Sequence, residues 1–547
     1  MKKNKKKNSA PELPEKGEST QEMDAIMDAA SAEDTAEIDL LLTRGDGTEE
    51  ETEASAAEAC DADDTPVLDD IPEVTDEVED APETEAAAFD DAAPAELASS
   101  DREAPAEDDE DDEDENDENR PDDENRPSEP APDEESTGAV DSDASGDYRK
   151  LGLYLHIPFC KSKCAYCDFY STDKIVCNGR KTPEEMKLYC TALKNNMRII
   201  SERTTQYNVD TVFIGGGTPT ALPPKLLLDI VREVERDFYL DDTCEFTVEM
   251  NPATADAKLL KKLRRAGVNR LSIGLQSGHN HELAALSRIH TTGDFTECFQ
   301  MAREAGFDNI NIDVMFGIPE QTKESFMETL AFAASMKPEH ISMYNLRIED
   351  GTPFGEKKHM LPLPDEDTEC AMYYDGIAYL ASQGYLQYEI SNFAREGYEC
   401  RHNLRYWRGE EYIGCGPAAH SYFGGRRFSL RRSLAQYCRA LETKGTSIPS
   451  SLLDESYVID RKEEVAEYLM LLLRLAEGID VADFAARFGG DFDAIFGKKL
   501  AFYIENGFMK HENGHYAFTP RGMFVSNHIL ARIIPFEPKY TKSGISG

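Results

Sequence analysis

The sequence predicts an α/β fold: a partial (β/α)6 TIM-type barrel between a long disordered acidic tail and a winged-helix-like α+β module. Three observations predict it. Acidic residues gather in the first part of the chain, six apolar runs then alternate with helical stretches, and a hairpin signal follows further helices near the end. The expected domains are an acidic tail, a barrel, an extension and a C-terminal module, at 1–147, 148–385, 386–450 and 451–540.

The tail is set apart by its charge. Residues 1–147 hold 54 acidic and 10 basic side chains, so most of the formal charge of −49 on the 547-residue chain lies there. The segment has one aromatic residue, Phe89, and repeats Asp-Glu-Asn-Arg-Pro at 117–121 and 123–127. Such a composition buries too little apolar surface to offset chain entropy, so we expect disorder. Apolar residues at near-helical spacing in 23–42 leave a transient docking helix as the alternative to a solvated spacer.

The remaining residues have an ordinary composition, with 48 basic and 53 acidic side chains. No segment carries the surplus of Lys and Arg that phosphate binding requires, so no nucleic-acid partner is expected. No window approaches the length of a transmembrane span, and the basic start at 1–7 precedes no apolar segment of a secretory signal. We therefore expect a cytoplasmic protein without a transmembrane segment, for which peripheral membrane contact stays open.

Strand-like and helix-like segments alternate after Tyr148, which is typical of parallel strands with helices packed outside. In such barrels the chemistry collects at the C-terminal ends of the strands. The unusual residues of this domain follow that rule, because most of them stand directly after a run. The six strand runs and four helical stretches are 153–157, 211–214, 245–249, 270–274, 309–316 and 340–346, and 225–238, 258–266, 295–305 and 323–335.

Three cysteines fall within eight residues, at Cys160, Cys164 and Cys167. Three thiolates on one loop can bind three irons of a cubane cluster, and the fourth iron then remains open for a small chelating ligand. Zinc is the alternative, which Cys177 could complete, although no second pair follows at the usual spacing. His156 lies beside this loop and is expected to support it.

The Cys-x3-Cys-x2-Cys spacing resembles the signature of the radical S-adenosylmethionine (SAM) superfamily. This resemblance implies a [4Fe–4S] cluster bound by the three cysteines and SAM on its open iron. It also implies that a glycine motif after the second strand meets the SAM amino group, and that residues after later strands bind its ribose, carboxylate and adenosine. The cofactor-binding residues implied are Tyr154, Phe169, Gly216, Gly217, Thr218, Glu249, Gln276, Arg288 and Asp313.

The flanks of the cysteine loop are similar to the anaerobic coproporphyrinogen III oxidase family. They read Tyr154-Leu-His-Ile-Pro-Phe-Cys160 and Cys167-Asp-Phe169. The later segments His402-Asn-Leu-Arg-Tyr-Trp407 and 414–421 resemble its HemW-like branch of heme chaperones. In the oxidases the resemblance implies a motif with a fourth cysteine, Cys-x3-Cys-x2-Cys-x-Cys. In this sequence Phe169 stands at the position of that fourth cysteine. This departure favours the chaperone branch over the oxidase reaction.

Two functions follow from the resemblance. The first is a heme chaperone in which His402 ligates heme iron, with His420 as the second candidate and Arg426 and Arg427 near the propionates. Its expected partners are heme, a heme-acceptor protein such as a respiratory one, and an electron donor such as a flavodoxin or ferredoxin. The second is radical catalysis on a tetrapyrrole, by oxidative decarboxylation or methyl transfer. His340 is expected to lie away from the site.

The C-terminal segment predicts a module rather than a reaction. Helical stretches at 463–475, 479–488 and 492–506 precede two alternating strands around Asn513-Gly514, a hairpin turn signal. This set resembles a winged helix. Because it lacks a basic recognition face, we expect it to pack on the barrel or on a protein partner rather than on DNA.

Overall fold

The computed structural model describes residues 148–177 and 181–534. The expected disordered tail and its docking helix lie outside the described residues. Everything below concerns the barrel, the strands that extend it and the C-terminal module.

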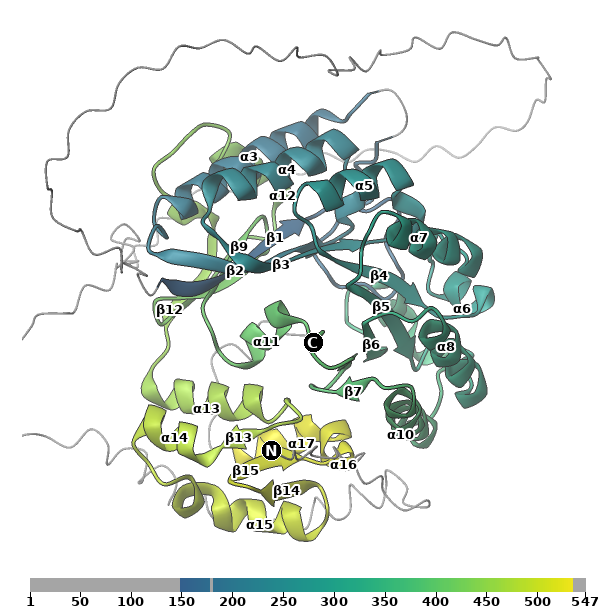
Figure 1. The fold of residues 1–547 in the computed structure, drawn as a ribbon, viewed down its shortest axis with the longest axis vertical. Helices are drawn as coiled ribbons and strands as arrows, with labels where there is room; N and C mark the ends of the chain where they lie inside the picture. Colours follow the sequence, from purple (N-terminus) through teal and green to yellow (C-terminus); the bar gives the residue numbers. More distant parts are fainter. Residues whose placement is uncertain (1–147, 178–180, 535–547) are drawn as a thin grey trace, which may run out of the picture. The chain divides into compact units, whose positions relative to one another are not determined.

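Six parallel strands form the barrel wall in their order along the chain (Figure 1). Each of the six predicted runs coincides with one of these strands, which confirms the partial barrel. Many apolar side chains of these strands are fully buried, among them Leu153, Val212 and Ile273, because both faces of a parallel sheet are covered. The strands are β1(Arg149–Ile157), β2(Tyr207–Gly216), β3(Leu240–Met250), β4(Arg270–Gln276), β5(Ile310–Phe316) and β6(His340–Asn345).

Helices cover the outer face of this sheet (Figure 1). The four predicted helical stretches correspond to α4, α5, α7 and α8, whereas α3 and α10 were not predicted. In α3 the exposed side, with Glu184, Lys187 and Thr191, opposes a buried side, so the helix is amphipathic although it was not predicted. The helices are α3(Glu184–Ser201), α4(Pro224–Asp237), α5(Ala257–Arg265), α6(Asn280–Ala285), α7(Thr292–Glu304), α8(Lys323–Ser335), α9(Pro353–Lys357) and α10(Glu366–Ser382).

Strands from 386–458 lengthen the barrel sheet at both edges, to twelve strands in the order β12-β11-β10-β9-β1-β2-β3-β4-β5-β6-β8-β7. The chain crosses from one edge to the other through α11(Arg401–Trp407), which lies on the concave side of the sheet (Figure 1). The added elements are β7(Leu386–Gln387), β8(Asn392–Ala394), β9(Tyr412–Cys415), β10(His420–Phe423), β11(Arg426–Leu430), α12(Leu434–Ala440) and β12(Leu453–Val458).

The C-terminal module combines helices with a three-stranded sheet in the order β13-β15-β14. The predicted hairpin is confirmed: Asn513 and Gly514 take φ of 54° and 80°, the left-handed values that its tight turn needs. The predicted 492–506 helix is continuous over 492–505, with a π-helical segment at Asp493–Gly497 that leads into α15. The elements are α13(Arg461–Leu472), β13(Ile479–Asp480), α14(Val481–Phe488), α15(Lys498–Glu505), β14(Met509–Glu512), β15(His515–Phe518), α16(Pro520–Phe524) and α17(Ser526–Ile533).

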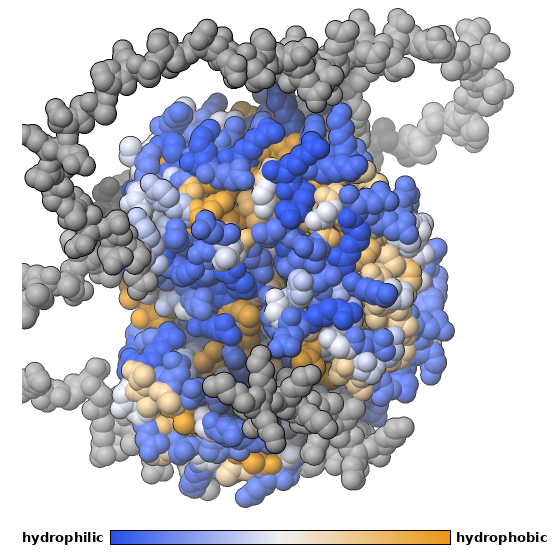
Figure 2. Space-filling model, in the orientation of Figure 1, coloured by the Kyte–Doolittle hydropathy of each residue, from blue (hydrophilic) through white to orange (hydrophobic). Residues whose placement is uncertain are grey.

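The face of the molecule in Figure 2 is mostly hydrophilic, with hydrophobic residues in separate small patches. Within the part of the chain that the structure describes, no helix is long and apolar enough to cross a membrane.

Candidate functional site

The three cysteines lie on the loop that follows β1, at the C-terminal end of the barrel. The loop is tied back to itself, because the Cys160 amide donates to the Thr172 carbonyl at 2.9 Å. Thr218, after β2, places its hydroxyl 3.7 Å from the Cys160 sulfur. Arg288, after β4, places Nη1 3.5 Å from the Cys164 sulfur. Burial raises the pKa of the Cys160 thiol and brings that of Cys167 to about 11, so each free thiol is protonated at neutral pH.

The loop fits a cluster better than a single zinc ion. Within residues 148–177 and 181–534 no three His, Cys, Asp or Glu side chains come together closely enough to hold one metal ion. A cubane cluster does not need that arrangement, because each thiolate binds its own iron. Gly217 leaves room beside the first thiol: a Cβ there would lie 3.1 Å from the Cys160 sulfur and 2.7 Å from the Phe159 carbonyl. Arg288 adds a positive charge where the thiolates would concentrate negative charge.

His156 joins three parts of the site. Its Nδ1 lies 3.0 Å from the Tyr154 hydroxyl, and its Nε2 lies 2.8 Å from the carbonyl of Tyr170 in the cysteine loop. Gly216 takes φ +107° and packs on the imidazole, where a Cβ would come within 2.6 Å of the ring. The expectation that His156 supports the loop agrees with these contacts, and the ring also fixes Tyr154 and the glycine motif.

The two predicted carboxylates face the inside of the barrel from neighbouring parts of the wall. Glu249 accepts from the Gly216 amide at 3.1 Å, and Asp313 accepts from Ser272 at 3.2 Å and from Asn311 at 2.8 Å. Burial, together with the charge of Asp313, raises the pKa of Glu249 to about 7. Burial also raises the pKa of Asp313. These carboxylates are therefore suited to accept hydrogen bonds from a polar ligand that displaces water.

Gln276 and Arg288 meet at the end of β4. Arg288 donates through Nη2 to the Gly274 carbonyl at 2.9 Å. Gly274 is required here, since a Cβ would stand 2.7 Å from the Gln276 amide nitrogen and 2.8 Å from Arg288 Nη2. All the predicted SAM residues thus lie at the C-terminal half of the barrel or line its interior.

A polar cavity of about 170 Å³ lies inside the barrel, and the predicted residues form only part of its wall. The sequence signal for the others was an alternation of polar residues within apolar strands, at Arg270 and Ser272, at Asn311 and Asp313, and at His340, Ser342 and Tyr344. Period-two alternation places such residues on one face of a strand. The lining residues are Tyr154, Phe213, Glu249, Arg270, Ser272, Asn311, Asp313, His340, Ser342, Tyr344, His402, Asn403 and Tyr406.

His340 was expected away from the site, and the structure corrects this. Its imidazole lines the cavity, with Nδ1 at 2.6 Å from the Asn311 side-chain oxygen and Nε2 at 2.8 Å from the Tyr388 hydroxyl. The strand start at which it stands is the floor of the cavity rather than the outside of the barrel.

His402 lies in α11, which fills part of the barrel interior near the start of β2, whereas the cysteine loop follows the end of β1. The residue is fully buried, its Nδ1 is 2.9 Å from the Thr211 hydroxyl, and its Nε2 is 2.7 Å from the Tyr406 hydroxyl. Its ring stacks on Phe213 at 5.3 Å between centroids, and burial lowers its pKa to about 3. The imidazole is therefore neutral, as a heme ligand must be. In this arrangement, however, both nitrogens have hydrogen-bond partners and neither faces solvent.

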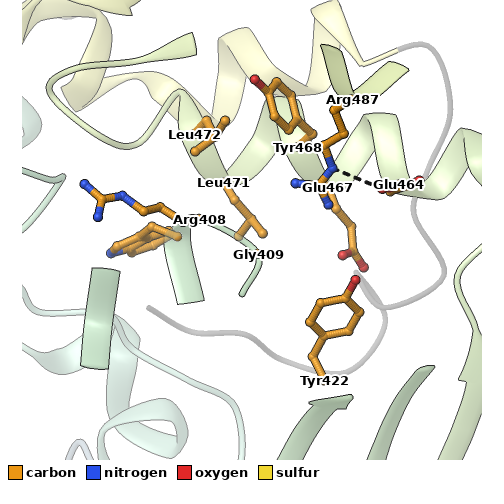
Figure 3. Close-up of a pocket in the computed structure, with 10 residues that line it drawn as sticks. Arg408, Gly409, Tyr422, Glu464, Glu467, Tyr468, Leu471, Leu472 and Arg487 are labelled. Atoms are coloured by element: carbon orange, nitrogen blue, oxygen red, sulfur yellow. Dashed lines mark hydrogen bonds and ion pairs between the residues drawn. The ribbon is translucent and has the colours of Figure 1, made fainter. Parts of the chain in front are cut away.

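Trp407 ends α11 and faces the C-terminal module instead of the cavity. It lines a cleft with Arg408, Tyr422 and residues of α13 and α14, which Figure 3 shows with the Arg487–Glu464 ion pair across one side. The free space there is about 10 Å³, enough for at most one water molecule. The motif thus divides between two surroundings, the barrel interior for His402 and Tyr406 and this tight contact for Trp407.

His420, the second heme-ligand candidate, has a different environment. It is exposed at the start of β10, and its ring has no hydrogen-bond partner among the described residues. Arg427, expected near the propionates, instead holds Glu467 of the C-terminal module with two contacts of 2.7 Å. Arg426 lies 3.3 Å from the Ser456 hydroxyl. Arg432 is exposed and donates to the Asp168 carbonyl in the cysteine loop at 2.8 Å, which links this surface to the cluster loop.

Phe169 occupies the position at which the oxidase motif has its fourth cysteine. Its side chain is 61% exposed, so it neither packs in the core nor supplies a sulfur ligand.

Comparisons with known proteins agree with this site. Residues 154–333 match the radical SAM superfamily, and residues 459–525 match the HemN C-terminal domain. The chain is 35% identical to the heme chaperone HemW of Bacillus subtilis over 386 residues, which cover 70% of this chain and 98% of that protein. It is 32% identical over 385 residues to the heme chaperone HemW of Escherichia coli K12, covering 70% and 97%.

A solved structure shares the fold: coproporphyrinogen III oxidase (HemN) from Escherichia coli, a radical SAM enzyme, with TM-score 0.60 and 23% identity over 71% of this chain and 90% of that one. The superfamily match implies SAM and a [4Fe–4S] cluster as cofactors, for which the cysteine loop and the barrel residues have the required donors. Given its identity to these relatives along almost their whole length, the chain belongs to the HemW family of the radical SAM superfamily.

Proposed function

We propose that this chain is a heme chaperone that binds heme beside a SAM-ligated [4Fe–4S] cluster and delivers it to an acceptor protein. The observation that carries the proposal is the 35% identity to a heme chaperone over 98% of that relative. Phe169 in place of a fourth cysteine supports it. A heme-acceptor protein, such as a respiratory one, and an electron donor such as a flavodoxin or ferredoxin are part of the proposal.

The heme ligand is best sought on the surface. The barrel cavity of about 170 Å³ and the Trp407 cleft are each too small for a porphyrin ring. His420 offers an exposed imidazole without a hydrogen-bond partner among the described residues. The exposed guanidinium of Arg432 is near enough to lower the pKa of His420 and, although it also contacts Asp168, suits a propionate. We therefore assign the axial ligand to His420. His402 would serve only if α11 left the barrel and both of its hydrogen bonds broke.

The test is heme titration of the full chain, reconstituted anaerobically, with His420→Ala and His402→Ala as the matched pair. Loss of the Soret band in His420→Ala alone, with cluster and SAM binding retained, supports the assignment. Loss in His402→Ala alone, without loss of thermal stability, refutes it and returns the ligand to α11. Absence of any saturable heme binding by the wild type refutes the chaperone proposal itself.

Radical catalysis on a tetrapyrrole remains the second candidate, because three of the predicted SAM residues, Tyr154, Glu249 and Asp313, line a polar cavity. Under this alternative the wild type, supplied with SAM and reductant, decarboxylates coproporphyrinogen III or methylates a tetrapyrrole. Product above the no-enzyme control would favour it over the chaperone function. The controls are the Ala variants of Cys160, Cys164 and Cys167, which we expect not to hold the cluster.

A further inference from the structure

Arg270 is a buried cation without a bonded partner. It opens β4, is 2% exposed, and is the largest of the fully buried side chains in the described part of the chain. Among those residues none accepts a hydrogen bond from its guanidinium, and no carboxylate oxygen lies within ion-pair distance. Its Nε is buried and unsatisfied, and the side chain lines the barrel cavity. Glu245 and Asp313 act on its charge from beyond hydrogen-bond distance, but Nε–H is left without an acceptor, and a buried donor without an acceptor is costly.

The neighbouring acceptors are already used elsewhere. Glu245 accepts from the Arg401 and His402 amides, both at 3.0 Å, and so caps the start of α11. Asp313 accepts from Ser272 and Asn311.

Other groups around the floor are also occupied. The Asn311 side-chain oxygen lies 2.6 Å from His340 Nδ1 and accepts from the Ser342 hydroxyl at 3.1 Å. The Tyr388 hydroxyl lies 2.8 Å from His340 Nε2 and accepts from the Cys400 amide at 3.2 Å. Among the residues that line the cavity, the buried side-chain atom left without a hydrogen-bond partner is Nε of Arg270.

We propose that the floor of the barrel cavity is a binding site for a carboxylate group, held by the guanidinium of Arg270. A planar guanidinium matches the two oxygens of a carboxylate with two parallel hydrogen bonds. Since an engineered cavity of about 150 Å³ in another protein binds benzene, a cavity of about 170 Å³ holds a molecule of roughly six non-hydrogen atoms. That is the size of a short-chain monocarboxylate such as propionate.

The charge of the cavity limits the ligand to a single carboxylate at this position. Glu249 and Asp313 line the same space and would repel a second anionic group. The raised pKa of both groups lowers the charge that the first carboxylate meets. The carboxylate can come from a free short-chain acid or from the arm of a larger molecule whose body stays outside. The site is separate from the surface assigned to heme iron, so it does not depend on the chaperone proposal.

The test uses the full chain, reconstituted anaerobically, and measures propionate binding by calorimetry and by the shift in thermal midpoint. Propionamide, which has the same shape without the charge, is the ligand control. Arg303→Gln is the protein control, because Arg303 pairs with Glu339 away from the cavity, at 2.9 Å. We expect saturable binding of propionate and not propionamide, weakened at least tenfold in Arg270→Gln and unchanged in Arg303→Gln. If heme displaces propionate, the natural ligand is a propionate arm of a larger molecule. If heme does not displace it, the natural ligand is a free short-chain acid.

Equal propionate affinity in Arg270→Gln and wild type would overturn the proposal, as would no preference for propionate over propionamide. If Arg270→Gln does not fold, Arg270→Lys replaces it, since lysine keeps the charge and loses the planar fork. We then expect propionate to bind Arg270→Lys more weakly than it binds the wild type. Undiminished binding to Arg270→Lys would contradict the proposal.

Discussion

Gly216→Ala tests how tightly the glycine motif, His156 and the cysteine loop are joined. Gly216 takes φ +107°, where an L side chain is strained by about 1–3 kcal/mol. The new Cβ would also stand 2.6 Å from the His156 ring. The ring cannot move away without breaking its contacts to Tyr154 at 3.0 Å and to Tyr170 at 2.8 Å, each worth about 1 kcal/mol. Together these effects predict a loss of about 3–5 kcal/mol in the free energy of unfolding.

Gly397→Ala is the matched control, because Gly397 has φ +85° and nothing within 4 Å of an added Cβ. It should lose only the strain of about 1–3 kcal/mol. The assay is urea unfolding of both apo variants and wild type, followed by iron content after reconstitution. We expect Gly216→Ala to lose about 2 kcal/mol more than Gly397→Ala and to hold less cluster, since Tyr170 belongs to the cysteine loop. Equal losses in the two variants, with full iron content, would refute the coupling.

Four further outcomes are expected. Cys164→Ala should lose the visible absorbance of the cluster, because the loop supplies only three cysteine ligands and the loss of one leaves a second iron without a protein ligand. Full iron content in this variant would contradict the prediction. Glu467→Ala should lower the thermal midpoint, because it removes the carboxylate that compensates the charge of Arg427 at a largely buried contact, whereas the paired change of both residues should recover part of the loss. Because burial raises the pKa of Glu249 to about 7, its folded form binds an extra proton and stability should fall as pH rises from about 4.5 to 7, a slope that Glu249→Gln should reduce. Removal of residues 1–147 should leave cluster and SAM binding unchanged, since the site residues all follow them; loss of either would show that the tail takes part.

Much of the barrel was predictable because two sequence patterns indicate a parallel sheet: apolar runs for its strands and amphipathic stretches for the helices that cover it. The helix α3 was not predicted, although its exposed residues Glu184, Lys187 and Thr191 recur at helical spacing. The cysteine loop was found from spacing alone. The cavity floor was not predicted, although alternation along the strands places Arg270 with Ser272, and His340 with Ser342, on one strand face. The apolar residues between them indicate a strand, and only the closed barrel shows that the polar face surrounds a cavity.

His402 shows why a motif does not by itself reveal its surroundings. An imidazole followed by an asparagine, a tyrosine and a tryptophan has the chemistry of a heme site, and the spacing of four places His402 and Tyr406 on one side of a helix. Whether that side faces a ligand or the protein depends on where the helix lies. Glu245, a residue more than 150 positions earlier, accepts from the His402 amide and fixes α11 inside the barrel. His402 and Tyr406 then bond to each other beneath the cavity, and Trp407 turns toward the C-terminal module. Any change in the cavity that shifts this short helix must also move the tryptophan, so the motif physically connects the barrel interior with the module.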